Sequence, residues 1–316
     1  MMLLVVQNKA DGKTYEISEL VSSISFSDSL NNGCSKLDFT YLHSGTVFEN
    51  GSIVMFKYGG VNIFFGYIFS YERGEDDGID VVAYDQLRYL KAKDSYNIED
   101  VRLDQVISKI AGDLKLIAGE VENTGYVLPK TAVDNQTYLD VIYDGISATL
   151  LGTGRKYAFY DSFGSLMLTD LAKMWLRVVI GEESLAYGYK YGQSIDDNTY
   201  NLVMIKKKTD VEGEFIPFKE PSEESIARYG LLQYFETAES NANSEQLREK
   251  ARALLRLLNR ETKSLSLDAI GVPEVRAGNS LFVNLPNLDI PKLVIVSSCK
   301  HSFETNKHTM SLELIL

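Results

Sequence analysis

Three histidines and two cysteines are the residues best suited to metal binding or nucleophilic catalysis. His301 and His308 lie seven positions apart on either side of a polar turn, so they can face each other across a hairpin. No His-Glu-x-x-His pattern accompanies them, and Cys34 and Cys299 are too few and too far apart in the chain to form a zinc site by themselves. We therefore predict no metal site. Surface or cross-strand polar contacts are predicted for His301 and His308, and reduced thiols for the cysteines.

Nucleophilic and phosphate-binding motifs are also missing. His43 stands beside Ser44 and Gly45 in a segment typical of a loop, and no Gly-x-Ser-x-Gly accompanies it, so no hydrolase triad is predicted. Gly152-Thr153-Gly154 follows a helical pattern rather than a strand and lacks the third glycine of a dinucleotide site. The two glycines are predicted to end a helix.

The remaining candidates for chemistry are carboxylates. The chain has 44 acidic residues, too many to single out the pair that glycosidic chemistry needs. Asp196 and Asp197 lack the regular ligand spacing of a calcium loop and are predicted to form a turn. No catalytic, cofactor-binding or metal-binding residue is therefore assigned.

The charge balance argues against nucleic-acid binding. The 316 residues hold 32 basic and 44 acidic side chains, a formal net charge of −12, whereas proteins that hold phosphates usually present basic surface. Lys206-Lys207-Lys208 precedes several acidic residues and is predicted to be a solvated strand end. Nineteen tyrosines, many in strand-like segments, suit core edges and also assembly surfaces. No apolar run reaches the length of about 20 residues that spans a membrane.

Residues 1–84 are predicted to be β-structure. Ile24 and Phe26 alternate with serines, and Leu37, Phe39 and Tyr41 alternate with Asp and Thr, the period of strands with one buried face. The turn residues 31–33 between these runs favour a hairpin with positive φ angles. Short strands joined by tight turns indicate an antiparallel barrel or sandwich.

Residues 85–170 are predicted to form an α/β insertion. Two segments show the apolar spacing of amphipathic helices, with Asp100 as a candidate cap for the first, and a hairpin is predicted from Lys156 to Leu168. The first helical stripe contains Leu103, Val106, Ile107, Ile110, Ala111 and Leu114; the second contains Tyr138, Val141, Ile142, Gly145, Ile146 and Thr149.

The remaining residues return to β-structure. Strands are predicted near 185–191 and 200–206, and a linker or long loop at 211–221. A helix with Leu247, Ala251, Leu254, Leu255 and Leu258 on one face follows, capped by Asn243 or Ser244. Alternating apolar residues then continue to Leu316, which favours a second antiparallel barrel.

The sequence resembles one known family in a series of short motifs. The segment Val81–Leu90 (VVAYDQLRYL) looks like the signature of the XkdQ/YqbQ-like proteins, which are baseplate hub proteins of contractile phage tails and phage-tail-like bacteriocins. Each later motif is short, but their order and spacing follow the family over nearly the whole chain. These motifs are Thr137–Ile142, Gly154–Tyr157, Ser194–Asn201, Ile226–Gly230, Val275–Gly278 and His308–Met310.

The resemblance implies a mainly β fold with two tail-tube-like antiparallel barrels. Residues 1–84 with about 171–215 would form the first barrel, 85–170 the α/β insertion, and 216–316 a linker, a helix and the second barrel. The implied protein is a structural hub without enzymatic activity or cofactor, located in the tail baseplate of a phage or bacteriocin and made in the bacterial cytoplasm.

The resemblance also implies partners. Three copies would form a ring that adapts the sixfold tail tube to the threefold central spike, contacting tube, spike and other baseplate proteins, with no membrane and no specific nucleic acid bound. Such a ring would carry a charge of −36, three times that of one chain. If much of this charge lined the bore, it would repel DNA passing through. The alternative functions are a tail enzyme that cleaves cell-wall glycan with a carboxylate pair and a small-ligand-binding barrel.

Overall fold

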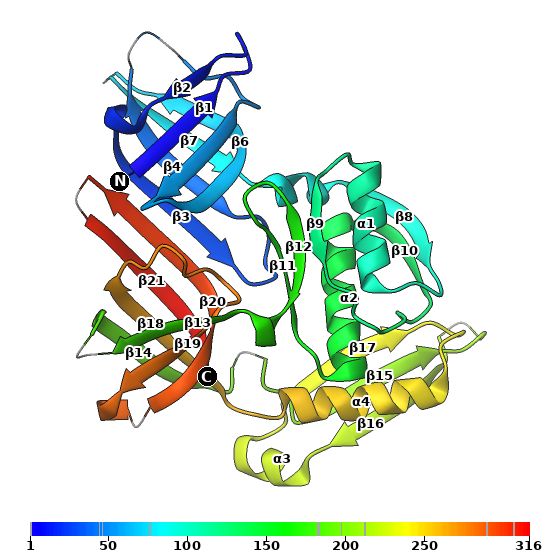
Figure 1. Ribbon diagram of the computed structural model, residues 1–316. Coiled ribbons are helices and arrows are strands. Elements are labelled where there is room, and N and C mark those ends of the chain that lie inside the picture. The colour runs from blue at the N-terminus through cyan, green and yellow to red at the C-terminus, as the bar shows by residue number, and fades with distance from the viewer. Residues whose placement is uncertain are drawn as a thin grey trace. The chain divides into compact units, whose positions relative to one another are not determined.

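The computed structural model describes residues 2–43, 45, 47–75, 77–181, 184–196, 198–211, 213–288, 290–305 and 307–316 (Figure 1). Strands predominate and a few helices accompany them, so the predicted mainly β fold is confirmed. The chain divides into two compact units: unit 1 contains residues 1–190 and 265–316, and unit 2 contains residues 191–264. None of the helices in the described residues is long and apolar enough to cross a membrane.

The first strands of unit 1 form an antiparallel array in the order β3-β4-β7-β6-β5-β1-β2. The predicted alternation is confirmed, because Ile24 and Phe26 of β3 and Phe39 of β4 are buried on one side. The predicted hairpin turn is also confirmed: Asn31 and Gly33 both have positive φ angles, 49° and 100°. The elements are β1 (Met2–Gln7), β2 (Thr14–Glu16), η1 (Ser18–Leu20), β3 (Val21–Ser29), β4 (Lys36–Leu42), β5 (Ile53–Tyr58), β6 (Val61–Arg73) and β7 (Gly78–Tyr84).

Strands from the second half of the chain extend the same sheet. The 15-residue strand β20 (Ile290–Glu304) pairs along one edge with β21 (Lys307–Ile315). On its other edge its first half pairs with β19 (Ser280–Leu285) and its second half with β3, so it joins the two groups of strands. The further elements here are η3 (Leu171–Lys173), β13 (Trp175–Gly181), β14 (Ala186–Ser194), β18 (Thr262–Ile270) and η4 (Pro286–Leu288).

The pairing of β13 and β14 differs from the expected grouping of residues 171–215 with the first barrel. β13 runs parallel to β19, and β14 neighbours β18, so both lie among the C-terminal strands. Residues 202–208, also in that grouping, belong to unit 2. Alternating burial shows that a segment is a strand, but it does not specify which strand is its partner.

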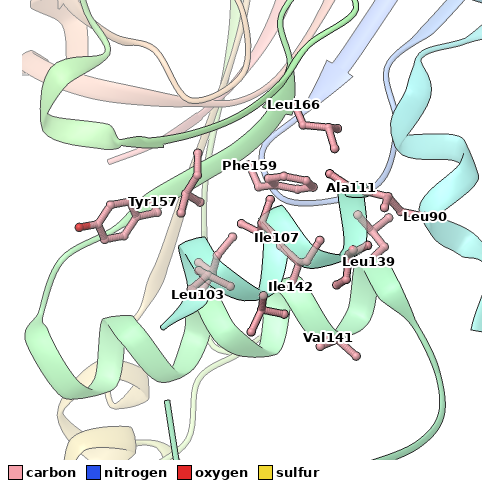
Figure 2. Packing of buried hydrophobic residues seen from close by; sticks show 14 of the residues in the cluster. Leu90, Leu103, Ile107, Ala111, Leu139, Val141, Ile142, Tyr157, Phe159 and Leu166 are labelled. Atoms are coloured by element: carbon pink, nitrogen blue, oxygen red, sulfur yellow. The ribbon is translucent and has the colours of Figure 1, made fainter. Parts of the chain in front are cut away.

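The segment between β7 and β13 has a core of its own, drawn from residues 87–168. Figure 2 shows side chains of its two long helices beside Phe159. Gly145 allows the helices to approach closely, because a Cβ there would lie 2.7 Å from Leu103 Cδ1. The elements are η2 (Gln86–Lys91), β8 (Lys93–Ile98), α1 (Leu103–Asp113), β9 (Ala118–Val121), β10 (Thr131–Thr137), α2 (Tyr138–Thr153), β11 (Tyr157–Asp161) and β12 (Leu166–Asp170).

Most of the predicted features of this segment are confirmed. The two apolar stripes face the core, and β11 and β12 form the predicted antiparallel hairpin. Gly154 ends α2 with a φ of 75°, as predicted for a helix stop. The predicted cap of α1 is wrong: the N-cap is Arg102, whose backbone N–H donates to Gln105 Oε1. Asp100 instead occupies a turn with a φ of 53°.

Unit 2 is a three-stranded sheet in the order β16-β15-β17, which contacts α4. The predicted cap of α4 is confirmed, because the Asn243 side chain accepts from the N–H groups of Glu245 and Gln246. The predicted linker at 211–221 is wrong, because β16 occupies most of it; this edge strand tolerates Pro217. The elements are β15 (Leu202–Lys208), β16 (Phe215–Pro221), α3 (Glu223–Tyr229), β17 (Gln233–Ala238) and α4 (Ser244–Leu258).

Candidate functional site

The predicted contact between His301 and His308 is confirmed. They lie on β20 and β21, and His301 Nδ1 is 2.9 Å from His308 Nε2. The carbonyl oxygen of Val275 lies 2.9 Å from His301 Nε2 and can only accept, so His301 carries its proton on Nε2. Its Nδ1 then accepts from His308 Nε2–H. The geometry fixes one tautomer for each ring in a neutral pair.

The surroundings of this pair favour its neutral state. Burial lowers the pKa of His301 to about 4. Burial, together with repulsion from His301, lowers the pKa of His308 to about 4. The His308 ring stacks on Phe303, with ring centroids 4.2 Å apart. Among the described residues, no group of three or more His, Cys, Asp or Glu side chains could hold a metal ion. The pair is therefore built as a packing contact between strands.

The other residues considered for chemistry are separate from one another in the fold. Cys34 is half-buried and Cys299 is buried, and both are free thiols. Burial raises the pKa of Cys34 to about 11, so it remains a thiol at neutral pH. His43 lies in a loop, where its backbone N–H donates to the Asp77 carbonyl. Asp196 lies in a bend, and Asp197 lies outside the described residues.

A buried polar junction in unit 1 joins three parts of the chain that are distant in sequence. Arg276, in the loop between β18 and β19, places Nη2 3.0 Å from Asp28 Oδ2 on β3. Its Nη1 donates to the carbonyl oxygen of Asp161 on β11 at 3.0 Å. The guanidinium also lies 4.0 Å from the ring centroid of Tyr160. Arg276, which lies in a loop near the C-terminus, therefore contacts both an N-terminal strand and the 85–170 segment.

Asp85 and Ser35 connect the same junction to the start of β4. Asp85 Oδ2 accepts from the backbone N–H of Ser35 at 2.9 Å, and Oδ1 accepts from that of Leu87 at 2.9 Å. The Ser35 hydroxyl donates to Asp28 at 3.2 Å. Burial raises the pKa of Asp85 to about 8, and repulsion from Asp161 adds to the rise. Asp85 thus ends β7 and holds the first turn of η2.

Asp161 and Gln86 complete the junction. Gln86 Nε2 donates to Asp161 Oδ2 at 2.7 Å, and Gly164 N–H donates to Asp161 Oδ1 at 2.8 Å. Gln86 Oε1 in turn accepts from the Ile117 N–H at 3.3 Å. Burial raises the pKa of Asp161 to about 6. These contacts engage both carboxylate oxygens with groups of the chain, so the arrangement positions backbone segments rather than a reacting ligand.

A second connection between the same parts uses an amide side chain. Asn31 Nδ2 donates to the Tyr157 carbonyl, and Asn31 Oδ1 accepts from the Phe159 N–H, both at 2.8 Å. Asn31 therefore satisfies the edge of β11 as a neighbouring strand would. Close by in sequence, Gly33 N–H donates to the Tyr143 hydroxyl at 2.9 Å. The turn between β3 and β4 is thus fixed to the 85–170 segment.

Unit 2 has its own polar contact point, built on Asn201. This residue is fully buried; its Nδ2 donates to the Gly230 carbonyl at 2.7 Å, and its Oδ1 accepts from the Leu232 N–H at 2.8 Å. Thr199 Oγ1 donates to the Arg260 carbonyl at 2.9 Å, which fixes the chain after α4. In the part of unit 2 that the structure describes, the buried polar side chains are thus neutral.

Four of the seven short motifs that carry the family resemblance meet at these two places. Asp85, Gln86 and Arg276 belong to two of the motifs and share the junction in unit 1. Asn201 and Gly230 belong to two others and contact each other in unit 2. Motifs far apart in sequence therefore correspond to contacts that hold each unit together.

Two residues of the junction, Asp28 and Asp161, belong to no motif, but the sequence holds a signal for them. Asp28 continues the inward phase of β3 after Ile24 and Phe26, and Asp161 continues that of β11 after Phe159. An acid at an inward position of an alternating strand is buried, and a buried charge requires a partner. The inward positions of these two strands therefore identify Asp28 and Asp161 as buried carboxylates.

Comparisons with known proteins match most of the chain. The family model described as YQBQ-like matches residues 24–315. The uncharacterized protein YqbQ of Bacillus subtilis (strain 168) is 32% identical over 281 residues, covering 86% of this chain and 83% of that protein. The phage-like element PBSX protein XkdQ of the same strain is 31% identical over 275 residues, covering 84% of this chain and 82% of that protein.

Solved structures share the fold at low sequence identity. The 43 kDa tail protein of prophage MuSo2 from Shewanella oneidensis matches with a TM-score of 0.73 and 14% identity, over 99% of this chain and 98% of that one. The E. coli c3393 protein, a type VI secretion component described as similar to T4 tail proteins gp27 and gp5, matches with a TM-score of 0.58 and 11% identity, over 93% of this chain and 73% of that one. The resemblance stated from the motifs is confirmed: the chain belongs to the YQBQ-like family and has the fold of phage tail proteins.

Proposed function

We propose that this protein is a structural hub in the baseplate of a contractile phage tail or of a phage-tail-like particle. The observation that carries the proposal is the match over most of the chain to XkdQ, a protein of the phage-like element PBSX, together with the fold of a prophage tail protein over 99% of the chain. The structural similarity of c3393 to the T4 bacteriophage tail proteins gp27 and gp5 supports a place in the tail.

In this proposal the strands of unit 1 supply two tube-like barrels. The first consists of β1–β7, and the second consists of β13, β14 and β18–β21, with β20 shared at the boundary. Residues 85–170 form an insertion between them. Three copies would present six barrels, which would match a sixfold tube above and a threefold spike below. The buried junction then has a structural purpose, because it fixes the insertion to both groups of strands.

The proposal assigns no catalytic role. The two buried carboxylates that repel each other, Asp85 and Asp161, accept hydrogen bonds from backbone and Gln86 groups inside unit 1. The partners proposed are the tube protein, the spike and other baseplate proteins, with DNA only passing through the bore. The particle forms from chains made in the host cytoplasm.

Electron microscopy of purified tail particles tests this function. We expect three copies of this chain at the end of the tube, between tube and spike, and a chain carrying an internal tag to add density there. A chain that is absent from purified particles, or that lies along the tube, would contradict the proposal. Incubation with cell-wall glycan provides a second readout, in which steady release of saccharides would favour the enzymatic alternative.

A further inference from the structure

The sheet of unit 2 has one face that α4 does not cover. Val203 and Ile205 of β15 are buried on the α4 side, so the alternate residues face the other way. Phe215 and Phe235 on this face are 44% and 51% exposed, which is unusual for two large rings in one small sheet. We call it the lysine face; its members include Leu202, Met204, Lys206, Lys208, Phe215, Pro217, Lys219 and Phe235.

Positive charge sits at the centre of the lysine face. Lys206 Nζ lies 5.8 Å from the ring centroid of Phe215 and 5.7 Å from that of Phe235. Lys208 is paired with Glu239 at 2.7 Å. Within the described residues, no carboxylate oxygen lies within 4.0 Å of Lys206 or Lys219. The face therefore combines exposed aromatic surface with two uncompensated cations, and an acidic surface with apolar neighbours would complement it.

Such a surface exists on unit 1 of the same chain. Residues 191–264 hold 13 acidic and 11 basic side chains, a net charge of −2, so the rest of the chain carries −10 of the total −12. The acids concentrate at the hairpin between β6 and β7, where residues 72–80 include five acidic residues and one basic residue. The charge difference between the units thus has a local source.

The end of this hairpin forms a hollow of about 270 Å³, which we call the acidic hollow; its lining contains the two acids Glu72 and Asp80 and one basic residue, Arg73. Glu72 and Asp80 line it and stand directly opposite each other on β6 and β7, a like-charge pair that costs stability. Thr40 also lines the hollow and donates to Asp80 Oδ1 at 2.5 Å. Leu42 lies two residues beyond Thr40 on β4, is 58% exposed, and supplies apolar surface beside the hollow.

We propose that the acidic hollow of one copy docks on the lysine face of a second copy, with Lys206 entering between Glu72 and Asp80. Leu42 would then pack on the exposed rings of Phe215 and Phe235. Each copy carries one hollow and one lysine face, so the contact is head-to-tail, and such contacts close into rings when the rotation allows. This proposal rests on the proposed hub function and names the contact that would join its subunits.

Charge exchange in the full-length chain tests the contact. Lys206→Glu and Glu72→Lys should each raise the Kd of self-association at least about tenfold, because each puts like charges in contact. The chain with both substitutions should recover wild-type self-association, since the pair is restored with its signs exchanged. Lys156→Glu, which changes an exposed lysine of unit 1 by the same charge, is the matched control and should leave the Kd unchanged. Sedimentation velocity at low and high salt gives the Kd values, and salt should weaken the wild-type contact.

The outcomes separate this contact from the hub function. A wild-type chain that stays monomeric at every concentration, or a double variant that does not recover, would overturn the contact. If particles nevertheless contain three copies at the end of the tube, the hub function stands without it. If the charge exchange behaves as expected but the chain is absent from particles, the contact stands and the hub function fails. A folded monomer in which the hollow and the lysine face of one chain protect each other from hydrogen exchange would also overturn the proposal.

Discussion

The two units of this protein place their charges in opposite ways. Unit 1 buries the ionisable groups Asp28, Asp85 and Asp161, with Arg276 paired to Asp28, and exposes an acidic hairpin end. In the described part of unit 2 the buried polar groups are neutral, with Asn201 at the centre, and the exposed sheet face carries lysines. Burying a charge is expensive unless it is paired, whereas a buried amide needs only its hydrogen bonds. The stability of unit 1 should therefore depend strongly on pH and on the side chains that pair with its buried charges. The stability of unit 2 should depend on neither.

The largest effect is expected from removing the buried cation. Arg276→Ala leaves Asp28 buried without its ion pair, and breaking a buried pair from one side costs about 3–5 kcal/mol of unfolding free energy. Arg228→Ala in unit 2 is the matched control, because its pair with Glu261 is exposed and should be worth less than about 1 kcal/mol. Urea denaturation measures both. Equal small losses would show that unit 1 does not depend on its buried charge.

The next effect is a pH dependence confined to unit 1. The pKa of His301 falls from about 6.5 in the unfolded chain to about 4 in the folded chain, so His301 binds a proton less readily when folded. Its stabilising contribution is complete above pH 6.5 and is lost as the pH falls toward 4, by about 3 kcal/mol. The buried carboxyl groups respond in the opposite sense, because the raised pKa values of Asp85 and Asp161 favour folding as the pH falls. The pH dependence of the wild-type unfolding free energy alone would therefore not reveal the contribution of His301.

A difference between two variants isolates that contribution. His301→Gln keeps a donor for the Val275 carbonyl and an acceptor for His308 but does not titrate. The difference in unfolding free energy, variant minus wild type, should therefore rise by about 3 kcal/mol as the pH falls from 7 to 4. Urea denaturation across this range gives the difference. A constant difference would mean that the histidine pair does not resist protonation.

Asn201→Ala gives the corresponding test in unit 2, with a smaller effect. The substitution leaves the Gly230 carbonyl and the Leu232 N–H without their partner, which should cost about 2 kcal/mol. Because no ionisable group changes, this cost should be the same at pH 7 and pH 5. Hydrogen exchange should increase mainly in residues 191–264. A cost that varies with pH would break the contrast between the units.

The sequence was most informative where a local pattern determines the structure. Alternation identified β3, β4 and the hairpin β11–β12, and helical spacing identified α1, α2 and α4, because each pattern reflects which side of one element is buried. Strand partners were less accessible. β13 lies beside β19 rather than among β1–β7 because pairing depends on contacts with residues about a hundred positions away in the sequence. The segment 211–221 has the composition of a linker because its prolines and charges lie on an edge strand, where both are tolerated.

For the polar junction too, local sequence patterns do not specify which residues come into contact. Its backbone hydrogen bonds depend on how loops return to β3 and β11, which no local pattern encodes. The motifs nevertheless contained Asp85, Gln86, Arg276 and Asn201, so a family resemblance identified residues whose contacts only the structure explains. Asp28 and Asp161 required a different signal, the inward phase of their strands.

The smallest expected effect on the unfolding free energy comes from the exposed charges. It is a stabilisation, whereas Arg276→Ala and Asn201→Ala destabilise the chain. Glu72→Lys replaces a like-charge pair with Asp80 by an opposite-charge pair across two strands, which should stabilise the chain by about 0.5–1 kcal/mol. Glu75→Lys, in the turn of the same hairpin, changes the net charge equally and should have a smaller effect. Thermal denaturation of both variants measures the difference. If Glu72→Lys is more stable but self-associates less, the cost of holding two carboxylates opposite each other is explained by the surface that they form. If it is destabilised, the pair is held by contacts inside unit 1 and the hollow is a consequence of folding rather than a docking surface.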